Sequence, residues 1–67
     1  MKTELVKIIE MPTHAIEEGW IRARIEKTPL GEHIARIVWP ERDIEEAQLI
    51  SLELKALAAY HMGDGEA

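Results

Sequence analysis

The chain has 67 residues with 13 acidic and 8 basic side chains, a formal net charge of -5 and no cysteine. A chain of this length forms one domain and buries only about 60% of the surface that it exposes when unfolded, so its stability is expected to be marginal. The composition excludes disulfides and cysteine-ligated metals, and the negative charge disfavours general attraction to nucleic acid or to an anionic membrane.

Hydropathy sets the expected location and extent of the domain. No apolar run approaches the roughly 18 residues of a membrane-spanning helix, and no signal-peptide core precedes the first charges. We therefore expect a cytoplasmic protein without a membrane partner. One domain over 1–67 is expected to be ordered over about 4–62 and to end in a disordered acidic tail at 63–67.

The first predicted element is a strand over 4–11, which is rich in β-branched side chains and partly alternates with charges. Pro12 ends it. Few polar residues lie on either side, so this strand suits a position covered on both faces or one at a subunit contact, and it could pair within the chain or with a neighbouring subunit. Residues 13–19 form either one helical turn, with Thr13 as N-cap and Gly19 after its end, or an irregular loop.

The central prediction is a β-hairpin over 20–39, closed by Thr28-Pro29-Leu30-Gly31. Pro29 suits the second position of a type I turn, and Gly31 can adopt the left-handed conformation of a bulged three-residue loop. If Thr28 faces Glu32, the alternating apolar residues all share one side of the hairpin. The expected cross-strand pairs are Ile25 with Ala35, Ala23 with Ile37, and Ile21 with Trp39.

The last predicted element is a helix from Pro40 or Asp43 to Met62. Asp43 and Glu46 have the spacing of a capping box, and Gly63 is a natural terminator. At 100° per residue, one broad apolar face is expected to cover the sheet. It consists of Ile44, Ala47, Ile50, Leu54, Leu57, Ala58 and His61. The chain is thus predicted to be α+β, with a three-stranded antiparallel sheet in order β-β-β-α and one long C-terminal helix packed on one face.

A second apolar stripe lies on another side of the same helix, and it includes Leu49, Leu52, Ala56 and Tyr60, with Ala59 beside them. One stripe is enough to cover a small sheet, so the second predicts a subunit or partner interface, most simply that of a homodimer. The alternative is that these are ordinary exposed apolar residues.

Trp20, Arg22, Arg24 and Arg36 are predicted to share the opposite side of the hairpin. Pairing sets Arg24 against Arg36, a like-charge contact that needs neutralisation. An anion or single-stranded nucleic acid could provide it, as could an acidic protein partner. In the third alternative, Glu10, Glu26 or a partner subunit's acids pair with the arginines and leave an ordinary solvated face.

Metal binding and catalysis have weaker support in the sequence. An antiparallel return of the helix could bring His61 to His33, where Glu32 could assist metal binding or a pH response, but the spacing matches no metal motif and no metal or cofactor is expected. His14 lies in a loop and needs no special role. No nucleophile motif or glycine-rich phosphate loop is present, and the only serine, Ser51, suits a bond to the helix backbone, so we expect no enzyme and no catalytic residues.

These observations predict a non-enzymatic, small acidic interaction protein that forms a homodimer and binds and inhibits or regulates another protein. Phage-encoded inhibitors and bacterial antitoxins include domains of this size, charge and topology, and no motif assigns the chain to either. The alternative is a small nucleic-acid-binding regulator that uses the arginine-bearing sheet face. Salt dependence separates the two, because binding that neutralises phosphates weakens steeply as salt rises.

Overall fold

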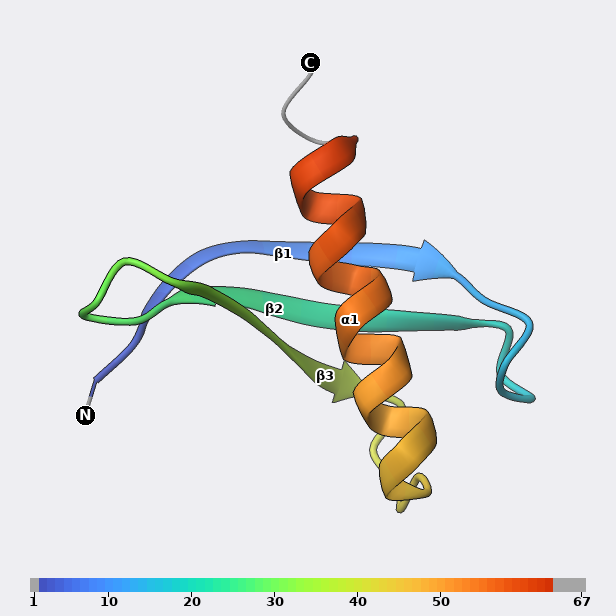
Figure 1. Cartoon of the computed structure of the whole chain (residues 1–67). Coiled ribbons are helices and arrows are strands. Elements are labelled where there is room, and N and C mark those ends of the chain that lie inside the picture. Colours follow the sequence, from blue (N-terminus) through green and yellow to red (C-terminus); the bar gives the residue numbers. More distant parts are fainter. Residues whose placement is uncertain (1, 64–67) are drawn as a thin grey trace.

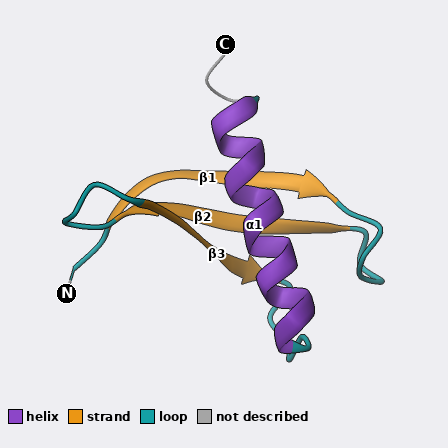
Figure 2. Ribbon diagram, in the orientation of Figure 1, coloured by secondary structure: helices purple, strands orange, loops and turns teal. Residues whose placement is uncertain are grey.

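The computed structural model describes residues 2–63, which form three strands followed by one helix. They are β1 (Glu4–Pro12), β2 (Trp20–Lys27), β3 (His33–Trp39) and α1 (Glu46–Met62). The strands make one antiparallel sheet in the order β1-β2-β3, and α1 crosses one face of it (Figure 1, Figure 2). The α+β prediction is confirmed. The predicted acidic tail, apart from Gly63, lies outside the described residues, and none of the helical segments described could span a bilayer.

The β2–β3 hairpin closes as its turn residues predict. The Thr28 backbone N–H donates to the Glu32 carbonyl at 2.8 Å, and the Gly31 N–H donates to the Thr28 carbonyl at 2.9 Å. Gly31 has a φ of +89°, which an L side chain rarely adopts. The cross-strand pairs that follow from this turn, including Ile25 with Ala35, are the predicted ones.

The predicted pairing fails at the far end of the hairpin. Trp39 lies opposite Arg22 and not opposite Ile21, because the register shifts between Arg22 and Ala23 and leaves Val38 as an extra residue on β3. A bulge of this kind sets two residues against one and reverses the side of every residue beyond it. Trp39 therefore leaves the helix-covered face for the opposite one.

Residues 13–19 form an irregular loop, the second of the two alternatives for this segment, and no helical turn forms. The Thr13 backbone N–H donates to the Gly19 carbonyl at 3.0 Å, and the Thr13 hydroxyl accepts the Ala15 N–H at 3.1 Å. Gly19 has a φ of +84°. The loop returns the chain so that β1 pairs with β2 along its whole length, within the same chain.

The core lies between the sheet and α1. Its buried residues come from the 13–19 loop, from β2, from β3 and from the helix, and they are Ile16, Ile21, Ala23, Ile25, Ala35, Leu52 and Ala56. Ile9, Met11, Ile37, Leu57 and Tyr60 pack around them. All three β2 residues in this set are fully buried, as expected for the central strand under a helix.

The helix orientation predicted from the sequence is wrong. Leu52 is 1% exposed and Ala56 is fully buried against the sheet, whereas Ile50 and Leu54 are 49% and 62% exposed. Leu52, Ala56 and Tyr60 of the stripe assigned to a subunit interface thus pack on the chain's own core, and Leu49 is half-buried beside them. In the broader arc, Ile50 and Leu54 turn outward, while Leu57 also packs against the core. A small residue at the centre of the stripe permits close approach of helix and sheet.

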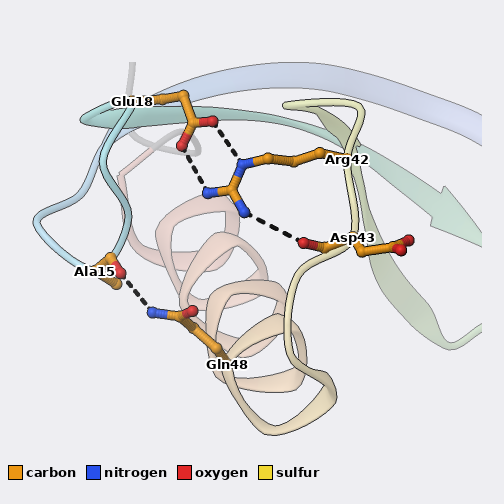
Figure 3. A network of polar contacts seen from close by, with 5 residues as sticks. All are labelled: Ala15, Glu18, Arg42, Asp43 and Gln48. Carbon is orange, nitrogen blue, oxygen red and sulfur yellow. Dashed lines mark hydrogen bonds and ion pairs between the residues drawn. The ribbon is translucent and has the colours of Figure 1, made fainter.

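The start of α1 is fixed by contacts with the 13–19 loop and not by a capping box. Glu45 precedes the helix without a side-chain cap bond, so the Asp43 capping prediction fails. Instead, the Arg42 guanidinium donates to both carboxylate oxygens of Glu18, at 2.7 and 2.8 Å, and the Gln48 amide donates to the Ala15 carbonyl (Figure 3). The hydrogen bond from Arg42 lowers the pKa of Glu18 to about 2.

Candidate functional site

The helix covers one face of the sheet and leaves the other bare (Figure 1). Strand alternation and the observed register assign residues of all three strands to this bare face, and the bulge adds Trp39. Its members are Leu5, Ile8, Glu10, Pro12, Trp20, Arg22, Arg24, Glu26, Ile34, Arg36 and Trp39. It includes every residue that the sequence predicted for a partner- or anion-binding face.

Two tryptophans from the ends of β2 and β3 stack on the bare face. The ring centroids of Trp20 and Trp39 are 4.1 Å apart, with an angle of 20° between the ring planes. The Arg22 guanidinium lies 5.4 Å from the centroid of the Trp20 ring, within the range of a cation–π contact. The pair therefore forms a partly exposed aromatic platform with a cation beside it.

The three arginines of the bare face are paired within the chain. Arg22 donates from Nε to Glu10 Oε2 at 2.9 Å, and Arg24 donates from Nε to Glu26 Oε2 at 2.8 Å. The Arg36 Nη1 atom lies 3.8 Å from the other oxygen of Glu26. The like-charge contact between Arg24 and Arg36 is thus neutralised by the carboxylate beside it, the third of the alternatives that the sequence left open.

Glu26 is the centre of this network. It is only 3% exposed and accepts the Thr3 hydroxyl at 2.6 Å in addition to the Arg24 bond. The pKa of Glu26 is lowered below its ordinary value, mainly by the hydrogen bond from Thr3 and then by the hydrogen bond from Arg24. The positive charges of Arg36 and Arg24 lower it further. No buried polar side-chain atom among residues 2–63 lacks a partner, so the buried part of this network is satisfied within the chain.

The geometry defines what this face can bind. Three arginines and two glutamates leave a surplus of one positive charge, which is too small to hold a phosphate chain by charge alone. The aromatic platform borders a shallow open hollow of about 280 Å³, lined by Glu10, Met11, Pro12 and Trp20. A contact surface of aromatic rings, arginine stems and exposed isoleucine is the composition typical of protein interfaces.

The predicted approach of the two histidines is confirmed. His33 at the start of β3 and His61 near the end of α1 have ring centroids 5.5 Å apart, and Tyr60 lies beside both. Within the part of the chain that the structure describes, no cluster of three metal-ligating side chains forms. This aromatic cluster is a packing contact between the helix and the hairpin.

No family model, curated protein or solved structure matches this chain. Among residues 2–63, the bare face carries polar and aromatic side chains from all three strands.

Proposed function

We propose that this chain is a non-enzymatic interaction protein that binds and inhibits or regulates another protein through the bare face of its sheet. The observation that supports the proposal is the stacked pair of Trp20 and Trp39 on a sheet face that none of the four described elements covers. Tryptophan and arginine dominate the binding energy of protein interfaces, because both bury large contact areas while keeping a polar end.

The paired charges support a protein target over a polyanion. Glu10 and Glu26 already satisfy the arginines of the bare face, so a partner does not have to supply acids to each of them. The bare face presents apolar surface at the two tryptophans and at the half-exposed Ile8. The ion-paired arginines and glutamates lie around this surface. Such an arrangement gives affinity at its centre and specificity at its rim.

The test uses the protein as an immobilised bait with matched variants. Trp39→Ala removes half of the aromatic platform, and Leu30→Ala alters a residue that is 81% exposed in the turn between β2 and β3, outside both strands. A partner captured from a cell lysate is identified by mass spectrometry, purified and titrated by calorimetry. We expect Trp39→Ala to weaken binding by roughly thirtyfold or more, as loss of an interface hot spot does, and Leu30→Ala to leave it unchanged. A partner bound equally by both variants would contradict the proposal.

One observation favours a second candidate, binding of single-stranded nucleic acid. Bases stack on exposed aromatic rings with arginine beside them, and the Trp20, Trp39 and Arg22 arrangement offers such a platform. Quenching of tryptophan fluorescence by oligothymidine and oligouridine, compared at about 50 and about 200 mM salt, separates the candidates. Quenching that weakens steeply with salt supports nucleic-acid binding, and its absence at low salt excludes it.

A further inference from the structure

An apolar groove lies between α1 and the edge strand β3. It has a volume of about 190 Å³ and is lined by His33, Ile34, Ala35, Ile50, Glu53, Leu54 and Leu57. Two of the helix residues in it are about half exposed or more, at 49% for Ile50 and 62% for Leu54. This is the arc of the helix that remains after the other stripe has packed on the sheet.

The backbone of β3 is free on the side next to this groove. The hydrogen bond from Thr28 to Glu32 makes the turn residues a hydrogen-bonded pair, so the alternate residues Ile34 and Arg36 direct their backbone groups to β2. The backbone groups of His33, Ala35 and Ile37 consequently point to the outer edge of the sheet, beyond which no strand lies among residues 2–63. Three residues with free donors and acceptors thus lie beside an apolar groove.

We infer that this edge and groove bind a second copy of the chain, with the two β3 strands antiparallel about a two-fold axis. An antiparallel pair with two-fold symmetry is self-complementary when it is centred on one residue. Centred on Ala35, it sets His33 of each copy opposite Ile37 of the other, so the free backbone groups of all three edge residues find partners. The two sheets then join into one of six strands with both helices on the same side.

The charges on the bare face agree with this register. Centring on Ala35 places Arg36 of one copy opposite Ile34 of the other. If the pair were centred on Arg36 instead, the two Arg36 side chains would lie opposite each other and repel. The second copy's β3 residues that share the helix side of the sheet extend over the groove and cover Ile50 and Leu54. A chain of 67 residues without cysteine gains the apolar burial that its single core lacks.

The other edge strand is protected against the same pairing. β1 contains a bulge between Leu5 and Lys7 and ends in Pro12, two devices that discourage strand addition. No bulge interrupts β3 between His33 and Ile37. The inferred contact is centred on the edge of β3 and the groove, which adjoin the bare face at Ile34 and Arg36, and it does not depend on whether the proposed target binds the tryptophan pair.

Light scattering and sedimentation test the dimer with two matched variants. Wild type is expected to have twice the chain mass of 7.6 kDa. Leu54→Glu places a charge in the groove and is expected to raise the dimer dissociation constant by roughly thirtyfold or more. Ile8→Glu alters a side chain of similar exposure, 47%, on β1 and the bare face, and is expected to leave the dimer intact. Circular dichroism checks that both variants fold.

Amide hydrogen exchange provides a second readout at the strand itself. The Ala35 amide, which points to the free edge, is expected to be protected in wild type and to exchange fast in the Leu54→Glu monomer, while the Arg36 amide, bonded to β2, stays protected in both. A wild-type mass of one chain at concentrations up to about 1 mM overturns the inference. So does a dimer that survives Leu54→Glu and dissociates with Ile8→Glu, because it would use β1 or the bare face instead.

Discussion

The two faces of the sheet are built from alternate residues of the same strand, and they are stabilised in different ways. On the covered face of β2, Ile21, Ala23 and Ile25 are fully buried under α1. On the bare face, Arg24 and its neighbour Glu26 form ion pairs. One face is stabilised by loss of apolar surface from water, and the other carries charges that pair within β2 and with its neighbouring strands.

This difference separates stability from binding. Apolar burial supplies most of the folding free energy, so changes on the covered face should cost more than changes on the bare face. The arginines of these ion pairs are partly exposed, and such pairs contribute less to stability than apolar burial, although Glu26 itself is buried. Substitutions at neighbouring positions of β2 can therefore test directly whether the two faces contribute differently to stability.

The largest effect is expected for Ile25→Ala on the covered face. Removal of a fully buried isoleucine side chain leaves a cavity under α1 and should lower the free energy of unfolding by about 2–5 kcal/mol, enough to unfold much of a domain this small. Urea unfolding followed by circular dichroism measures the loss. The smaller change Ile25→Val should cost about 0.5–1.5 kcal/mol. Equal, small losses for both variants would show that the covered face is loosely packed.

A smaller loss is expected for Glu26→Gln on the bare face. The amide can still accept the Thr3 hydroxyl, but Arg24 and Arg36 lose the carboxylate that neutralises their contact. Thermal unfolding should show a lower midpoint, less reduced than for Ile25→Ala. The control is Glu10→Gln, which affects an exposed pair with Arg22 and should change the midpoint less. A larger loss for Glu10→Gln than for Glu26→Gln would place the centre of the network elsewhere.

Acid should weaken the fold through its paired carboxylates. The pKa of Glu18 is lowered from 4.5 to about 2, and that of Glu26 is lowered as well, so the unfolded chain binds more protons than the folded one in this range. Stability should be fully present above about pH 4.5 and fall toward pH 2. Arg42→Gln should make this decline shallower, because it removes the partner of Glu18. Urea midpoints measured across this range test the effect, and identical declines in both proteins would refute it.

The smallest effect on stability is expected for Arg24→Ala. Glu26 keeps the Thr3 hydroxyl and Arg36 as partners, and the substitution also removes the like-charge contact with Arg36. We expect the thermal midpoint to change by no more than that of a typical surface variant, within a few degrees. A loss as large as that of Ile25→Ala would show that the two faces do not differ in the way described.

Local patterns in the sequence were enough to predict the β2–β3 hairpin, but they left open whether β1 pairs within the chain or with a neighbouring subunit. The Thr28-Pro29-Leu30-Gly31 turn fixed the register of the hairpin, and alternation assigned Arg22, Arg24 and Arg36 to one face. Trp39 was misplaced because a bulge at Val38 reverses the sides of the strand, and nothing in the alternation marks it. The aromatic platform, the main feature of the candidate site, depends on this one irregularity.

For the helix, the periodicity of apolar residues did not determine which side of α1 faces the sheet. Two apolar arcs are visible in its sequence, and their period cannot say which of them faces the sheet. The choice is made by contacts between distant residues, Arg42 with Glu18 and Gln48 with the Ala15 carbonyl, which fix how the chain enters α1. The larger arc was predicted to cover the sheet, and the smaller one does, with Leu52 and Ala56 at its centre.

The turn of the β2–β3 hairpin is a suitable position for attaching a label. Leu30 lies in the turn between β2 and β3 and is 81% exposed, and the chain contains no native thiol. A Leu30→Cys variant would therefore accept a single fluorophore or spin label at a defined point. Distances between two such labels would report directly on how a pair of these molecules is arranged.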